Sequence, residues 1–171
     1  MEVLKERIRH VPNFPKAGIL FYDITTLLRD RDGFHQVIDA LASPYLNDRI
    51  DLVVGIESRG FILGGAVAYR MGAGFVPVRK LGKLPAKSIR VTYDLEYGTD
   101  SLEIHADAIS PGQRVLIVDD LLATGGTARA TADLVKQLEG TVHGLAFLIE
   151  LAELKGRERL AGENVFALLR Y

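Results

Sequence analysis

The sequence predicts an α/β fold in one domain, with a mostly parallel central sheet flanked by helices. Five apolar runs rich in β-branched residues are typical of strands that are covered on both faces. Segments with the 3.6-residue period of helices lie between them, and strands that alternate with helices indicate a parallel sheet. The 171 residues suit a single domain, 1–171, and no repeat or linker divides them.

The predicted elements alternate along the chain. The strands are 51–58, 74–80, 113–120, 141–150 and 164–171. The helices are 33–46, 60–72 and 125–140. One apolar stripe of the last helix is formed by Ala128, Thr131, Ala132, Val135 and Leu138. Ligands of such sheets bind at the carboxyl ends of the strands, so we expect the functional site at that edge.

The composition excludes several classes of function. There are 21 basic and 22 acidic residues, which leaves no basic surplus for nucleic acid. No apolar run approaches the ~18 residues of a membrane span, so we expect a cytoplasmic protein that binds neither membrane nor nucleic acid. The chain has no cysteine, which excludes disulfides, thiolate zinc sites and cysteine nucleophiles.

The stretch VLIVDDLLATGGTA, residues 115–128, carries the clearest chemistry. Asp119 and Asp120 end a predicted strand, and ATGGT at 123–127 opens the next helix. Glycine backbone N–H groups, threonine hydroxyls and the positive end of a helix together form a phosphate cradle. Each residue alone is better explained by a turn or a helix cap. As a set they indicate an anionic ligand with sugar hydroxyls or a metal beside it.

This set resembles the phosphoribosyl-pyrophosphate (PRPP) signature of the type I phosphoribosyltransferases, in the form found in adenine phosphoribosyltransferases. The resemblance implies the fold of that family, with an N-terminal hood and a flexible lid loop. It implies that Asp119 and Asp120 are catalytic and hold the ribose hydroxyls, and that Leu121 contacts adenine. The PRPP 5-phosphate would be bound by Ala123, Thr124, Gly125, Gly126 and Thr127.

The stretch GIESRGF, residues 55–61, follows a predicted strand and resembles the pyrophosphate loop of the family. The family often has a cis peptide at this turn, here between Glu57 and Ser58. The resemblance implies that Ser58 and Arg59 face the pyrophosphate. On the residues alone, a solvated turn is an equal reading.

A cluster of cations follows in VRKLGKLP, residues 78–85. Arg79, Lys80 and Lys83 would suit the pyrophosphate leaving group, in the same or a neighbouring subunit. The alternative is a solvated basic face.

Residues 83–109 alternate well enough to pair as a hairpin, yet the segment is long and polar, which favours a lid at about 83–106 over core structure. Its LEYG, residues 95–98, resembles the adenine enzymes. The resemblance implies that Glu96 is a catalytic base and that Tyr97 contacts adenine when the lid closes. The alternative for Glu96 is an exposed strand carboxylate.

The stretch FPKAGILFYDITTLL, residues 14–28, resembles the hood, which we place at about 10–30. The resemblance implies that main-chain groups near Leu20 read the adenine edge and that Phe21 stacks on the ring. Such stacking is worth ~1–3 kcal/mol per base in nucleic-acid sites. Tyr22 stands where many relatives carry arginine, and Ala17 where many carry proline. Without the resemblance, Phe21 reads as a core aromatic.

Together these motifs imply transfer of a phosphoribosyl group from PRPP to adenine, which gives AMP and pyrophosphate in purine salvage. The resemblance also implies a homodimer and Mg²⁺ held mainly by substrate, without a protein metal ligand. Two alternatives stay open: a phosphoribosyltransferase for xanthine or hypoxanthine, and a non-catalytic PRPP-binding regulator. The chain lacks the basic stripe that a DNA-binding regulator needs.

Overall fold

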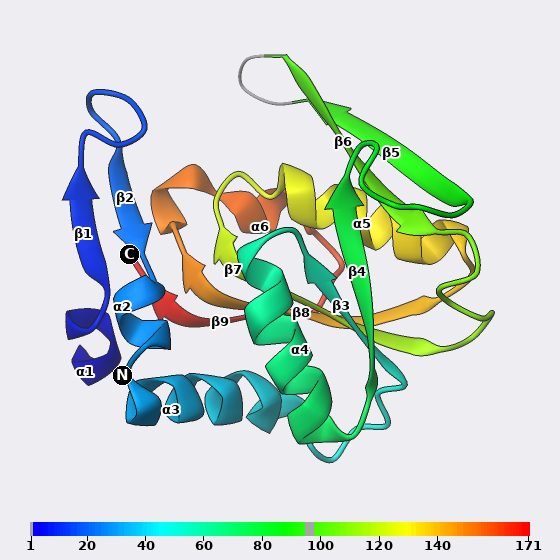
Figure 1. Ribbon diagram of the computed structural model, residues 1–171, viewed down its shortest axis with the longest axis horizontal. Coiled ribbons are helices and arrows are strands. Elements are labelled where there is room, and N and C mark those ends of the chain that lie inside the picture. Colours follow the sequence, from blue (N-terminus) through cyan, green and yellow to red (C-terminus); the bar gives the residue numbers. More distant parts are fainter. Residues whose placement is uncertain (1, 95–97) are drawn as a thin grey trace.

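The computed structural model describes residues 2–94 and 98–171 (Figure 1). The strands are β1 (Arg9–Pro12), β2 (Leu20–Asp23), β3 (Leu52–Ile56), β4 (Gly74–Lys80), β5 (Ser88–Asp94), β6 (Thr99–His105), β7 (Arg114–Leu122), β8 (Thr141–Glu150) and β9 (Val165–Arg170). The α-helices are α1 (Glu2–Glu6), α2 (Thr25–Leu28), α3 (Arg31–Ala42), α4 (Arg59–Met71), α5 (Gly126–Gln137) and α6 (Gly156–Arg159). Short 3₁₀ turns are η1 (Ser43–Tyr45) and η2 (Ala152–Leu154).

In the described part of the chain, seven strands form the main sheet in the order β5-β6-β4-β3-β7-β8-β9. Strands β4, β3, β7, β8 and β9 pair in parallel, while β5, β6 and β4 pair antiparallel. The predicted α/β fold with a mostly parallel sheet is therefore confirmed, with all five predicted strands present. Strand β7 continues two residues past the predicted end, because Leu121 and Leu122 still pair with β8.

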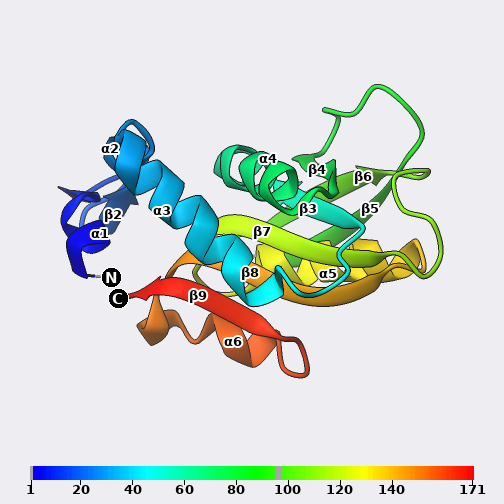
Figure 2. The ribbon, with the colours of Figure 1, turned by 90° about the horizontal axis from the view of Figure 1, so that it is seen from below.

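Helices cover both faces of the main sheet, with α3 and α4 on one side and α5 and α6 on the other (Figure 2). This arrangement explains the unbroken apolar run of β7. Leu116 and Val118 pack with α3 and α4, whereas Val115 and Ile117 pack with α5. All four are fully buried, and full burial stabilises the fold by about 1.5–3 kcal/mol for each such side chain. No helix of the described residues is long and apolar enough to cross a membrane.

Capping residues set the helix bounds. Helix α3 begins earlier than predicted because the side chain of Asp30 accepts a hydrogen bond from the Gly33 N–H at 2.6 Å. It ends earlier as well, since Pro44 lacks the N–H that would continue it. Helix α4 ends at Gly72, whose φ of 68° is a left-handed conformation that glycine adopts without strain.

Strands β1 and β2 form a separate two-stranded sheet in the predicted hood. Among the described residues, no backbone hydrogen bond joins this sheet to the main sheet. Its contacts with the main body are made by side chains, aromatic rings among them. The ring centroid of Tyr22 lies 4.3 Å from that of Tyr171, just after β9, and 5.1 Å from that of His10. At Tyr22, aromatic packing thus takes the place of the arginine of many relatives.

The predicted lid contains the hairpin of β5 and β6, but its base is not a free loop. Leu102 and Ile104 of β6 are 2% and 0% exposed and belong to the core on the α5 side. Strand β6 also pairs with the end of β4, where Lys80 lies opposite Leu102. The expectation of lid rather than core is therefore wrong for this strand, because its alternate side chains point inward. Glu96 and Tyr97 lie outside the described residues.

Candidate active site

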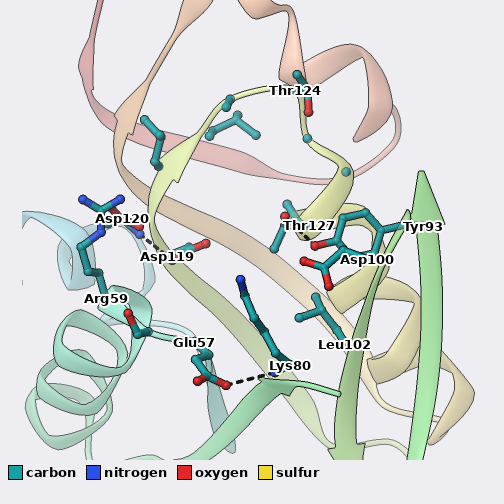
Figure 3. Close-up of a pocket in the computed structure, with 17 residues that line it drawn as sticks. Glu57, Arg59, Lys80, Tyr93, Asp100, Leu102, Asp119, Asp120, Thr124 and Thr127 are labelled. Atoms are coloured by element: carbon teal, nitrogen blue, oxygen red, sulfur yellow. Dashed lines mark hydrogen bonds and ion pairs between the residues drawn. The ribbon is translucent and has the colours of Figure 1, made fainter. Parts of the chain in front are cut away.

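A cavity of about 530 Å³ opens at the carboxyl ends of β3, β4 and β7 (Figure 3). The hood and the β5–β6 hairpin lie on opposite sides of the loop that leads from β7 to α5 (Figure 1). The predicted site residues that line the cavity are Ser58, Arg59, Lys80, Asp119, Asp120, Leu121, Ala123, Thr124, Gly125, Gly126 and Thr127. The structure thus brings the predicted phosphate cradle, acid pair and pyrophosphate turn into one place.

The phosphate cradle is packed tightly against the start of α6. Gly125 has a φ of 83°, and a Cβ atom built on it would lie 2.4 Å from the backbone oxygen of Gly156. A Cβ atom on Gly156 would in turn lie 2.3 Å from the backbone oxygen of Ala123. Real Cβ atoms do not approach backbone this closely, so both glycines are required for the shape of the loop. The cradle is therefore a fixed element that presents the first N–H groups of α5 to the cavity.

The two acids differ in their partners. Oδ2 of Asp120 lies 2.8 Å from Nη2 of Arg59, and Oδ1 of Asp119 accepts the Asp120 backbone N–H at 2.9 Å. Figure 3 shows Asp119 pointing into the cavity. The first turn of α4 approaches at Gly60, where a Cβ atom would lie 2.7 Å from Asp119 Oδ1. The side chain with the freer carboxylate oxygen is therefore that of Asp119.

Both acids have raised pKa values. Burial and then the neighbouring charge of Asp120 raise the pKa of Asp119 well above its ordinary value. Burial also raises the pKa of Asp120, although the Arg59 guanidinium opposes this effect. A buried acid pair with a single cation beside it is poised to accept hydrogen bonds from a neutral, hydroxyl-bearing ligand.

The turn after β3 has the cis peptide between Glu57 and Ser58 that the family resemblance implied. The carboxylate of Glu57 holds the end of β4: it accepts hydrogen bonds from the Lys80 backbone N–H at 3.0 Å and from Arg79 Nε at 3.2 Å. Burial acts to raise the pKa of Glu57, but these bonds and the Arg79 charge hold it below its usual value. Sequence reasoning missed this anchoring role of Glu57.

The three cationic residues of the predicted cluster, Arg79, Lys80 and Lys83, do not all line the cavity. The side chain of Lys80 points into the cavity (Figure 3). Arg79 instead turns to Glu57 and donates to the backbone oxygen of Lys83 at 3.2 Å. Neither Arg79 nor Lys83 lines this cavity. Only Lys80 of this cluster is thus placed to meet an anion here.

A second cavity of about 380 Å³ lies under the hood, lined by Val11, Phe14, Phe21, Asp23, Thr25 and Arg59. The guanidinium carbon of Arg59 lies 5.1 Å from the centroid of the Phe21 ring. Arg59 lines both cavities, so the space beneath Phe21 adjoins the acid pair. Leu20 is 43% exposed and lines neither cavity.

Three residues of the hairpin line the main cavity without having been predicted, namely Tyr93, Asp100 and Leu102. Tyr93 pairs across the hairpin with Asp100. The signal available in the sequence was the period-two alternation of 83–109, which places alternate residues on one face. It did not show which face turns to the site.

The acid pair, the glycine loop and Lys80 lie at one edge of a parallel sheet that helices cover on both faces. This arrangement defines the class of protein: an α/β protein that binds a phosphorylated ligand bearing hydroxyl groups. Residues 25–163 match the model of the phosphoribosyl transferase domain. Over 170 residues, 99% of this chain and 94% of the relative, the chain is 66% identical to an adenine phosphoribosyltransferase of Acidobacterium capsulatum. The chain therefore belongs to the adenine phosphoribosyltransferase family.

Solved structures agree with this assignment. The fold matches a crystal structure of adenine phosphoribosyltransferase from Thermoanaerobacter pseudethanolicus with a TM-score of 0.97 and 52% identity, over 99% of both chains. It matches the Saccharomyces cerevisiae enzyme with a TM-score of 0.92 and 45% identity, over 98% of this chain and 97% of the other. The yeast structure is a complex with adenine and an imino-altritol bisphosphate.

Proposed function

We infer that the protein transfers the phosphoribosyl group of PRPP to adenine and releases pyrophosphate, which is the activity of an adenine phosphoribosyltransferase. This function is supported by one observation: the phosphate cradle, the acid pair and Lys80 line one cavity beside the hood. Related chains at 66% and 64% identity over nearly the full length are adenine phosphoribosyltransferases.

We propose a task for each part of the cavity. The cradle at 123–127 binds the 5-phosphate through helix N–H groups and hydroxyls. Asp119 and Asp120 accept hydrogen bonds from the ribose hydroxyls, and Lys80 with the Ser58–Arg59 turn faces the pyrophosphate. Adenine, under Phe21, then displaces pyrophosphate at the anomeric carbon through a transition state with oxocarbenium character. The hairpin limits access of water, which would otherwise attack that cation.

Turnover of PRPP with each purine base in turn tests this function. We expect AMP with adenine and at least ~100-fold lower kcat/KM with hypoxanthine or xanthine, because a site built to hydrogen-bond one base edge rejects a base that leaves its groups unpaired. A preference for hypoxanthine or xanthine would indicate the other phosphoribosyltransferase. PRPP binding without turnover of any base would indicate a regulator.

We propose Mg²⁺ as the cofactor. Asp119 and Asp120 give the cavity a negative charge that suits a cation, and Mg²⁺ favours substrate phosphates and waters over a cage made only of protein, so we expect an ion held mainly by substrate and no protein metal ligand. Bound Mg²⁺ would neutralise charge on the pyrophosphate. Removal of divalent ions with EDTA is expected to stop turnover, and Mg²⁺ to restore it.

Glu96 is proposed as the base that takes the proton from adenine. Replacement by glutamine keeps hydrogen bonding but removes the basic group. We expect kcat of Glu96→Gln to fall at least ~10-fold, since general-base assistance is typically worth ~10²–10⁴ in rate. PRPP affinity, measured by calorimetry, should stay the same, which marks a transition-state interaction. Parental turnover across the pH range would remove Glu96 from this role.

The raised pKa of Asp119 predicts how activity depends on pH. A protonated Asp119 loses the charge that draws the ribose hydroxyls, so kcat/KM for PRPP should fall as the pH falls through this pKa. An ordinary aspartate has a pKa of ~3.9. Because the pKa of Asp119 is raised, kcat/KM should begin to fall at a higher pH than it would with an ordinary aspartate. The pH profile of Asp119→Asn should lack this limb. An identical acidic limb in both proteins would contradict the assignment.

We propose a homodimer and a cytoplasmic location. Ile62 and Tyr69 of α4, Phe75 of β4 and Leu81 are exposed large apolar side chains, with Tyr69 91% exposed. Such residues gather at interfaces between copies of one chain, and Arg79 and Lys83 lie near them in sequence. Light scattering is expected to give twice the chain mass, and Ile62→Arg with Tyr69→Arg to give the monomer. A parent protein that is monomeric and fully active would contradict the dimer.

A further inference from the structure

Tyr93 of β5 joins the hairpin to the phosphate cradle. Its hydroxyl lies 3.2 Å from Oγ1 of Thr127 (Figure 3). Its ring lies along Gly126, where a Cβ atom would come within 3.3 Å of Cδ2 of the ring. Tyr93 therefore contacts the cradle in two ways, through ring packing and through one hydroxyl contact.

The hydrogen bonds around Thr127 determine what its hydroxyl can do. A threonine hydroxyl has one proton to donate and two lone pairs to accept with. The backbone oxygen of Thr127 accepts a hydrogen bond from Thr131 Oγ1 at 2.9 Å. Besides the backbone N–H, the side-chain hydroxyl is the group of this cavity-lining residue that can donate to a ligand. If the Tyr93 hydroxyl donates to Oγ1, the proton of Thr127 is left for an acceptor in the cradle.

The surroundings of Tyr93 keep its phenol protonated. Burial raises the pKa of Tyr93 above its ordinary value; the hydrogen bond with Thr127 acts to lower it, and the charge of nearby Asp100 acts to raise it. The phenol is thus a donor throughout the neutral range. Either oxygen of the Tyr93–Thr127 pair can be the donor. A phosphate in the cradle offers only acceptors, which favours the order Tyr93 to Thr127 to phosphate.

We propose that Tyr93 is a positioning residue for the 5-phosphate: its hydroxyl donates to Oγ1 of Thr127 and so directs the Thr127 proton to a phosphate oxygen. This inference rests on the proposed function of the same cavity. When a phosphate is bound in the cradle, the same hydrogen bonds connect it to Tyr93 of β5, which lies three residues before Glu96. Phosphate binding thereby holds the strand that leads into the segment of the proposed base.

The test uses Tyr93→Phe, which removes the hydroxyl and keeps the ring on Gly126. AMP and adenosine differ only in the phosphate, so calorimetry with both isolates its contribution. We expect AMP to bind about tenfold more weakly to Tyr93→Phe, in line with the loss of one hydrogen bond in a chain that ends on a charged group. Adenosine affinity should not change. Parental AMP affinity in Tyr93→Phe, or an equal loss for adenosine, would overturn the proposal.

A double-mutant cycle with Thr127→Val shows whether Tyr93 acts through Thr127. In the Thr127→Val protein, Tyr93→Phe should cause no further loss of AMP affinity. A further loss of the same size would overturn the proposal, because Tyr93 would then act on the phosphate by another route. The matched control is Thr92→Val, which removes the exposed contact of Thr92 with Ser101 at 2.9 Å on the same hairpin and should leave AMP affinity unchanged.

The outcomes also separate this inference from the proposed function. A parent protein that makes AMP, together with a Tyr93→Phe variant of parental AMP affinity, would overturn the inference alone. A parent protein that neither binds AMP nor turns over PRPP would overturn both.

Discussion

Replacing Asp119 and Asp120 together with asparagine is expected to lower kcat at least ~100-fold, an effect of the size seen when preorganised charge at a transition state is removed. The substitution preserves the shape of both side chains and removes both negative charges. Ribose hydroxyls gain positive character as pyrophosphate departs, so the carboxylates stabilise the transition state more than bound PRPP. The loss should therefore be larger in kcat than in PRPP affinity.

The single variants should differ, because only Asp120 has an ion pair, with Arg59 at 2.8 Å. Asp120→Asn frees the Arg59 guanidinium beside Phe21 and should raise KM for adenine as well. Asp119→Asn should act on turnover alone. Steady-state kinetics measure both, with thermal unfolding as a check on the fold. Parental turnover in the double variant would remove the acids from catalysis, and a variant that does not fold would favour a capping role.

Gly125→Val is expected to abolish PRPP binding and to destabilise the fold. Valine at a φ of 83° is strained by about 1–3 kcal/mol. Its Cβ atom would also meet the Gly156 backbone oxygen at 2.4 Å, and overpacking of this kind costs about 1–3 kcal/mol more. The free energy of unfolding, measured by denaturant titration, should fall by the sum of these effects.

Gly162→Val is the matched control for this substitution. Gly162 has a φ of 87°, but nothing lies within 4 Å of the position of its Cβ atom. The Gly162→Val protein should be destabilised by backbone strain but not by a steric clash, and it should bind PRPP as the parent protein does. If Gly125→Val is no less stable than Gly162→Val, the close packing of the cradle against Gly156 does not matter to the fold. Parental PRPP affinity in Gly125→Val would refute the cradle itself.

The parts of the site that could be predicted from the sequence are those in which adjacent residues carry the chemistry. Asp119, Asp120 and the glycine loop are one continuous stretch, and the apolar run before them fixes their place at the edge of the sheet. Short-range patterns suffice for such features, because the backbone alone brings the groups together.

The parts that could not be predicted depend on contacts between distant segments. The sequence predicts Arg79 as a partner for pyrophosphate but does not indicate its hydrogen bond to Glu57, 22 residues earlier. Tyr93 reaches Thr127 across 34 residues, and neither stretch of sequence indicates the other. Leu102 was assigned to a polar lid because the alternation of its strand does not reveal which face meets the core.

The attachment of the hood has a consequence for how base choice can change. Because β1 and β2 meet the rest of the molecule through side chains such as Tyr22 and Tyr171, and share no backbone ladder with the main sheet, their sequence is free to vary without a change of strand register elsewhere. The hood, which we propose as the base-binding part, can in this sense be exchanged separately from the main sheet. A hood grafted from an enzyme for another purine would need an aromatic side chain that packs against Tyr171, and no change in the loop at 123–127.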